Sequence, residues 1–329
     1  MARRPLCLCF GVALWCTGVV PLTAQGTARR FALSETDTLA VTDSGAGPAV
    51  VLVPGLLGGA FGFRRVTAAL AADGYRTIVI EPLGIGASSR PGGSDYSLEA
   101  QAVRIARVLE ELHVDSAIFV CHSVAGSMCY RLALRAPAAV RAIVAINAGP
   151  DEHAATAAGL RFALRFAPLI RVIGGAGTAR RRLRAGLIEG SADPAWVTAE
   201  VVEAYTRPFG DMDSALRALR GMAAARDTAP LAPRLGGIRA CVLLLVGAGS
   251  ERGTTSAADI DLLTRSIPDI TVQRIGGAGQ YIQEERPAAI IDAVAALHAQ
   301  RARVPQQCRS GDPPARGRST SALPAVAAR

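Results

Sequence analysis

Short apolar runs and longer segments with helical periodicity alternate through the first half of the chain. The apolar runs predict strands at 37–42, 49–53, 76–80, 116–120 and 141–146. The segments between them predict helices at 64–72, 98–112 and 124–136. Because these strands are nearly continuous in apolar residues and are separated by helices, they favour a mostly parallel sheet covered on both faces.

After Gly149 the alternation stops, and helical signals follow one another to about Arg234. The helices expected in this insertion are 154–173, 178–188, 194–205 and 212–225. Alternation then resumes with strands at 241–246 and 270–274 and helices at 257–266 and 287–300. The pattern predicts an α/β core made of residues 37–149 and 235–300, with a helical cap at 150–234 inserted after the sixth strand.

Both ends of the chain differ from the body in composition. Residues 1–24 have the features of an export signal: Arg3 and Arg4, an apolar stretch from Leu6 to Val20, and small residues before Gln25. That stretch is shorter than the ~20 residues that a membrane span needs, so we expect export to the periplasm or medium and no stable span. Residues 303–329 are rich in proline, serine, arginine and alanine, which predicts a disordered tail.

The charge and the cysteine content argue against several classes of function. The formal net charge is +9, and all 36 basic residues are arginine, spread along the chain with few aromatic residues among them. This spread argues against nucleic-acid binding. The cysteines have no zinc or CxxC spacing, so we expect no metal site, no cofactor and no disulfide framework, with Cys121 and Cys129 acting as small apolar residues.

The most informative motif is Cys121-His122-Ser123-Val124-Ala125-Gly126, between an apolar strand and a helix. A serine on such a sharp strand-to-helix turn stands exposed at the edge of a sheet. Further motifs follow the same order along the chain: 51–59 is glycine-rich after a strand, 81–88 reads EPLGIGAS, and 276–281 reads GGAGQY. Together they resemble the α/β-hydrolase superfamily, in its capped esterase-, epoxide-hydrolase- and haloperoxidase-like branch, over about residues 37–300.

The resemblance implies a role for each position. Ser123 is the nucleophile, and the backbone N–H groups of Leu56 and Val124 are the oxyanion donors. Gln280 occupies the position of the catalytic histidine, and Ser250 that of the acid. An amide cannot accept a proton at neutral pH, and a serine cannot stabilise an imidazolium, so the catalytic triad is degenerate.

Two residues at the start of the cap are candidates for a substitute base. His153 and Asp151 follow the sixth strand and could overhang the pocket, although a solvated hinge is the simpler interpretation of both. The other three histidines are not favoured: His122 is adjacent to the nucleophile but expected to pack structurally, while His113 and His298 lie away from the site.

Two functional hypotheses remain open at this point. The chain either acts on a small apolar carbonyl compound through Ser123 and the oxyanion hole, or it is a non-catalytic binding or interaction protein derived from a hydrolase. Ser123 at the elbow excludes the mechanism that uses an aspartate nucleophile. The sequence pattern makes no prediction of oligomeric state.

Overall fold

The computed structural model describes residues 26–152, 167–250 and 252–303. Its strands are β1 Thr27–Ala32, β2 Thr38–Ser44, β3 Ala49–Val53, β4 Arg76–Glu81, β5 Ala117–His122, β6 Val140–Ile146, β7 Cys241–Gly247 and β8 Ile270–Ile275. Its α-helices are α1 Arg64–Ala72, α2 Leu98–Glu111, α3 Ala125–Arg135, α5 Ala167–Glu189, α6 Ala199–Thr206, α7 Met212–Ala224, α8 Ala257–Ser266, α9 Ile282–Glu285 and α10 Pro287–Arg303. The short 3₁₀ helices are η1 Gly59–Phe63, η2 Pro194–Trp196, η3 Arg207–Phe209 and η4 Ala232–Gly237.

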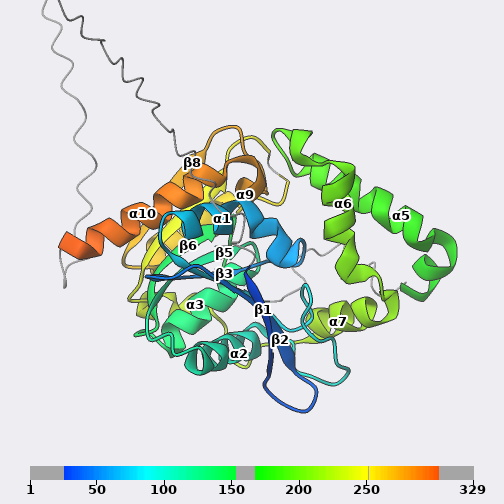
Figure 1. The fold of residues 1–329 in the computed structure, drawn as a ribbon, viewed down its shortest axis with the longest axis horizontal. Helices are drawn as coiled ribbons and strands as arrows, with labels where there is room; N and C mark the ends of the chain where they lie inside the picture. Colours follow the sequence, from blue (N-terminus) through cyan, green and yellow to red (C-terminus); the bar gives the residue numbers. More distant parts are fainter. Residues whose placement is uncertain (1–25, 153–166, 251, 304–329) are drawn as a thin grey trace, which may run out of the picture.

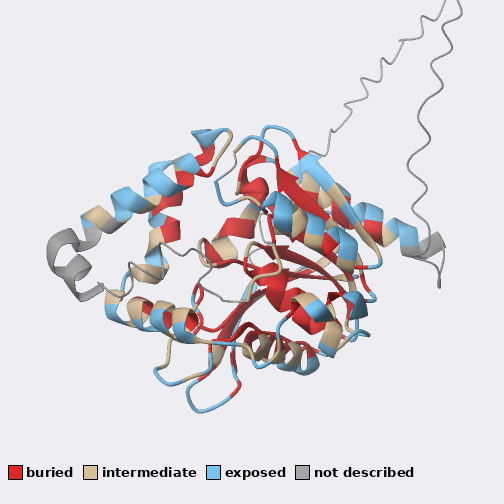
Figure 2. Ribbon diagram, turned by 180° about the vertical axis from the view of Figure 1, so that it is seen from behind, coloured by how far each residue is buried: buried red, intermediate tan, exposed pale blue. Residues whose placement is uncertain are grey.

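The eight strands form one sheet in the order β1-β2-β4-β3-β5-β6-β7-β8. The pairs β1–β2 and β2–β4 are antiparallel, and every other neighbouring pair is parallel. The predicted fold class, a mostly parallel sheet flanked by helices, is therefore confirmed. Figure 2 shows the sheet as the buried centre of the molecule.

Alternating side chains divide the core into two layers. On β3, Val51 and Val53 belong to the cluster that contains α2 and α3, whereas Val50 and Leu52 belong to the cluster that contains α1 and α10. Successive residues of a strand point to opposite faces, so each apolar run supplies both layers. The covering of both faces explains why these strands are apolar throughout.

The chain between β6 and β7 contributes α5, α6 and α7, which Figure 1 shows together on one side of the sheet. α5 and α6 contribute to a separate apolar cluster that also includes Trp196 of η2 and Tyr281 of the core. Ala218 and Met222 of α7 instead belong to the cluster that contains α2 and α3. Among the described residues no helix combines the length and apolar character needed to cross a membrane.

Two elements differ from the sequence expectations. β1 was not predicted, because its sequence TARRFA is exposed at four of its first five positions and lacks an apolar run. α5 is one helix of 23 residues, so the predicted break between 173 and 178 is wrong. Glycine is only mildly unfavourable inside a helix, and the three glycines near this point do not interrupt α5. Residues 154–166 of the first predicted cap helix lie outside the described residues.

Candidate active site

Ser123 lies at the tight turn between β5 and α3, and its backbone is left-handed with φ of 55°. The turn is held by hydrogen bonds from Ser123 N to Ile146 O at 2.9 Å and from Gly126 N to Ser123 O at 2.9 Å. A β carbon on Gly126 would lie 2.3 Å from Cβ of Ala148, so only glycine fits there. A non-glycine residue in this strained conformation is typical of a nucleophile elbow.

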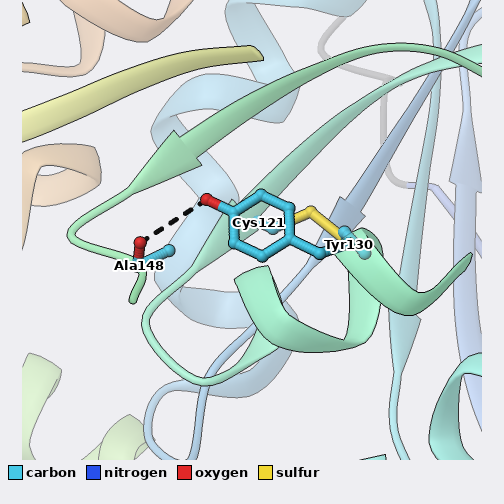
Figure 3. The surroundings of a disulfide bond; sticks show 4 residues. Cys121, Tyr130 and Ala148 are labelled. Atoms are coloured by element: carbon cyan, nitrogen blue, oxygen red, sulfur yellow. Dashed lines mark hydrogen bonds between the residues drawn. A yellow bond between two sulfur atoms is a disulfide. The ribbon is translucent and has the colours of Figure 1, made fainter. Parts of the chain in front are cut away.

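A disulfide between Cys121 and Cys129 encloses the elbow, joining the end of β5 to α3 (Figure 3). The next residue of α3, Tyr130, donates a hydrogen bond to Ala148 O at 3.5 Å, on the loop after β6. The interpretation of these cysteines as small apolar residues outside any disulfide is therefore wrong. Their spacing of eight residues gave no signal, because it is the strand-to-helix turn that brings them together.

Removing this disulfide is expected to destabilise the fold. Replacing both cysteines by alanine should lower the free energy of unfolding by about 2.5 kcal/mol, the loop-closure entropy for so short a loop. Urea unfolding with and without dithiothreitol measures the effect. Reductant should destabilise the wild type more than the double variant; an equal response of both proteins would contradict the expectation.

Of the two expected oxyanion donors, Val124 directly follows Ser123 in the chain, and Leu56 directly follows Gly55. Gly55, beside Leu56, passes close to the elbow: a β carbon there would lie 3.0 Å from His122 O and 3.3 Å from Ser123 Cβ. Within the described part of the chain, neither Leu56 N nor Val124 N has a hydrogen-bond acceptor. Two uncommitted amides beside a serine can stabilise negative charge on a carbonyl oxygen.

The loop that carries Leu56 is held in place by Glu81, a buried residue at the end of β4. Its Oε1 accepts a hydrogen bond from Ala60 N at 2.7 Å, and its Oε2 accepts one from Ala87 N at 2.9 Å. A β carbon on Gly86, whose φ is 56°, would lie 1.9 Å from the Glu81 carboxylate. Burial raises the pKa of Glu81, although both amide hydrogen bonds oppose that shift.

Gln280 belongs to the loop after β8, which lies against the elbow. The backbone carbonyl oxygen of Gln280 is 3.0 Å from His122 Nε2 and accepts a hydrogen bond from Asn147 Nδ2 at 3.1 Å. Its backbone N–H donates to Gly190 O at 2.7 Å. Asn147 also accepts a hydrogen bond from Gly247 N at 3.0 Å, so one buried amide joins the ends of β6 and β7 to this loop.

The Gln280 side chain lies beside the loop that contains Ser250. A β carbon on Gly253 would be 3.1 Å from Gln280 Cδ, and Gln280 Oε1 is buried without a hydrogen-bond partner in the described structure. Ser250 Oγ instead donates to Glu189 O at 3.3 Å. The structure thus brings the two loops together but forms no hydrogen bond between the side chains of Gln280 and Ser250.

His122 is neutral and does not act on Ser123. A carbonyl can only accept, so Nε2 carries the proton that is donated to Gln280 O. Burial lowers the pKa of His122 to about 4, which makes it a poor base at neutral pH. Among the described residues, no imidazole is hydrogen-bonded to Ser123 Oγ.

Asp151 packs on the α3 and α8 side of the sheet. Its backbone oxygen accepts a hydrogen bond from the buried Arg131 at 3.2 Å. Burial, and then the nearby charge of Asp259, raise the pKa of Asp151 to about 6. The structure gives it no hydrogen bond with Ser123, and His153, the other candidate base, lies outside the described residues.

Asp151 makes stability depend on pH. Because its pKa is raised from the usual 3.8 to about 6, its contribution is fully present below pH 3.8 and is lost as the pH rises through 6. Asp151→Asn should therefore increase the free energy of unfolding at pH 7.5 by about 1–3 kcal/mol and leave it nearly unchanged at pH 3.5. Urea unfolding at both pH values measures this, and an equal gain at both would contradict it.

Glu285 joins the Gln280 loop to the segment after α5. Its Oε1 accepts hydrogen bonds from Ala192 N at 2.6 Å and Asp193 N at 2.8 Å, and its Oε2 accepts one from Gly279 N at 2.7 Å. The approach of the two segments is close, since a β carbon on Gly279 would lie 2.2 Å from Gly190 O. One carboxylate therefore positions the loop that carries Gln280.

Glu284 forms a second, fully buried connection. It accepts a hydrogen bond from Tyr205 Oη at 2.9 Å and forms an ion pair with Arg64 at 2.5 Å. Tyr205 also covers the oxyanion loop, because a β carbon on Gly58 would lie 2.9 Å from its ring. Burial, and then the negative charge of Glu284, raise the pKa of Tyr205. No role was predicted from the sequence for Glu284, Glu285, Asn147 or Tyr205.

A small pocket adjoins the oxyanion loop. Leu56, Gly86 and Arg90 line it on the core side, and Phe209, Leu219 and Met222 line it on the side of η3 and α7. In the described ranges, no group of three or more His, Cys, Asp or Glu side chains is arranged to hold a metal ion. Within the described residues, the site therefore offers a serine, two free backbone donors and a small pocket, and no base is hydrogen-bonded to the serine.

Comparison with known proteins agrees with this geometry. A family model described as alpha/beta hydrolase fold matches residues 48–168. The magnesium-chelatase 30 kDa subunit of Rhodobacter capsulatus is 30% identical over 252 residues, which is 72% of this chain and 82% of that protein. Bifunctional epoxide hydrolase 2 of Mus musculus is 34% identical over 106 residues, 32% of this chain but only 19% of that protein, so the chain spans about a fifth of that relative.

Solved structures show the same architecture. The crystal structure of Cfl2 from Burkholderia cenocepacia superposes with a TM-score of 0.68 at 22% identity, covering 84% of this chain and 97% of that one. At this identity the likeness concerns the fold alone. The family match, the R. capsulatus relative and the eight-stranded sheet with its nucleophile elbow agree, and the chain belongs to the alpha/beta hydrolase fold family.

Proposed function

We propose that this protein binds a small, largely apolar carbonyl compound at the Ser123 elbow, with the carbonyl oxygen between the amides of Leu56 and Val124. The observation that carries the proposal is that both amides lack an acceptor among the described residues, while the serine is held at φ of 55°. The adjoining pocket, with Leu56 in its wall, supplies an apolar surface for the rest of the ligand.

Turnover through Ser123 is slow in this proposal. Gln280 and Ser250 occupy the positions of the base and the acid. Asp151 has a raised pKa but no hydrogen bond to Ser123 in the described structure. Loss of the base of a serine triad costs about a millionfold in turnover, whereas the oxyanion hole and binding retain about a thousandfold over water. The name of the mouse relative indicates epoxide hydrolysis, but the serine at the elbow does not suit a mechanism with an aspartate nucleophile.

Hydrolysis of p-nitrophenyl acetate and butyrate tests this proposal. The wild type should exceed buffer by no more than about a thousandfold, and Ser123→Ala should keep most of that excess, because the oxyanion hole and the pocket remain. Rates of an ordinary esterase that disappear in Ser123→Ala would contradict the proposal, because they would require a working base beside Ser123.

A second candidate is a non-catalytic interaction protein. Two observations favour it: Gln280 leaves Ser123 without a base, and the R. capsulatus relative is named a subunit of magnesium chelatase. Ligand binding separates the two candidates. An interaction protein without a ligand should show no change in the NMR spectrum of a small ketone, whereas carbonyl recognition should shift its carbonyl carbon signal downfield through the two amide hydrogen bonds.

We also propose that the protein is exported. The disulfide at the elbow supports this, because disulfides persist mainly in oxidising compartments such as the periplasm. Activity measurements on the mature chain should accordingly be made without reductant.

A further inference from the structure

We propose that Arg90 is an anion-recognition residue and that the ligand carries a carboxylate besides its carbonyl group. The inference rests on the proposed carbonyl site for the position of the ligand, but it comes from a different part of the pocket. Arg90 is the charged residue in a wall otherwise made of glycine, proline and apolar side chains.

The guanidinium of Arg90 has unused hydrogen-bonding capacity. Its Nη2 donates to Gly86 O at 2.5 Å, and no other acceptor within the described ranges contacts it. No carboxylate of the described chain forms an ion pair with it. A guanidinium has five N–H donors in a planar fork that matches a carboxylate, so Arg90 can bind one bidentately.

The acidic groups near Arg90 are already engaged elsewhere. Glu81 and Asp211 act on Arg90 electrostatically from beyond ion-pair distance, as does Tyr96. Both oxygens of Glu81 accept backbone N–H groups, and Asp211 caps α7 by accepting from Ser214 N. A ligand carboxylate would therefore make the direct contact that the protein itself leaves open.

The arrangement also gives the order of groups along the ligand. Leu56 and Arg90 line the same pocket, so a carbonyl at the Leu56 amide and a carboxylate at Arg90 can belong to one molecule. Leu219 and Met222 of α7 line the same pocket and offer apolar contact to a short hydrocarbon chain. The chemical class that fits is a short oxo acid or the half-ester of a dicarboxylic acid.

Matched pairs of ligands test the two sites separately. Pentanoate and methyl pentanoate differ in the carboxylate and have no ketone, while levulinate and methyl levulinate add a ketone to the same chain. Dissociation constants are measured by NMR titration of the full chain at low salt, where charge–charge attraction is least screened. We expect each acid to bind about tenfold more tightly than its ester, from charge-assisted hydrogen bonds to Arg90.

The variants identify the residue responsible. Arg90→Gln should abolish the preference for acids, whereas Arg220→Gln, which removes an exposed arginine of α7 outside the pocket, should retain it. Arg90→Lys keeps the charge but not the planar fork, and it should retain part of the preference. A preference for acids that is partly retained in Arg90→Lys would also show that its loss in Arg90→Gln does not come from misfolding.

Different outcomes overturn different proposals. Equal binding of acid and ester, or an acid preference that survives Arg90→Gln, would overturn the assignment of Arg90 and leave the carbonyl site untouched. Equal binding of levulinate and pentanoate would overturn the carbonyl site, because only levulinate carries a ketone, while the comparison of each acid with its ester still decides the role of Arg90. Absence of binding by all four compounds would overturn both.

Discussion

Combining Gln280→His with Ser250→Asp is expected to raise the turnover of p-nitrophenyl acetate by about 10²- to 10⁴-fold, the usual contribution of general acid–base catalysis. The two positions lie in neighbouring loops: a β carbon on Gly253 would be 3.1 Å from Gln280 Cδ. The carbonyl of residue 280 is already fixed by His122 and Asn147, so a new imidazole would start from a defined backbone position. Steady-state kinetics of the purified double variant measure the gain.

Two control variants test the roles of the introduced acid and of Ser123 separately. Gln280→His alone supplies a base without its acid and should gain less than the double variant, because the imidazolium then lacks a stabilising carboxylate. Adding Ser123→Ala to the double variant should remove the entire gain. A folded double variant that hydrolyses the ester no faster than wild type would show that position 280 is not where a base can serve Ser123.

Local patterns predicted most of the scaffold that holds this site. The helix predicted at 64–72 and the strand predicted at 49–53 have the same bounds as α1 and β3, because both have clear periodicity and sharp turns at their ends. β1 was not predicted because an edge strand buries few side chains and needs no apolar run. The order of the motifs along the chain was enough to predict the elbow, because the turn is a local feature.

The contacts that position the site could not be predicted from the sequence. Glu285 binds amides at 192, 193 and 279, and Cys121 pairs across a turn with Cys129. Neither partner set follows from spacing, because tertiary packing decides which backbone groups a buried carboxylate meets. Arg90 was one of many arginines in a chain with 36 basic residues, and only its place in the pocket wall distinguishes it.

Replacing Glu285 by alanine is expected to lower the free energy of unfolding by about 4 kcal/mol, because three backbone N–H groups lose their acceptor and each such loss costs about 1–3 kcal/mol. Glu285 is 9% exposed, so water can compensate only in part. The change should also separate Gly279 from residues 192 and 193, and with them the loop that carries Gln280. Urea unfolding monitored by circular dichroism gives the stability difference.

Two further variants show that the effect comes from these hydrogen bonds. Glu285→Gln keeps one carbonyl oxygen as an acceptor and should cost about half as much as Glu285→Ala, since the acceptor is neutral and only one oxygen remains. Glu110→Ala, at an exposed position near the end of α2, removes the same atoms where they accept no hydrogen bond and should change stability by less than about 0.5 kcal/mol. A cost for Glu285→Ala as small as that of Glu110→Ala would mean that the two segments stay together without the carboxylate. Their close backbone packing, seen where a β carbon on Gly279 would meet Gly190 O at 2.2 Å, would then be sufficient to position the Gln280 loop.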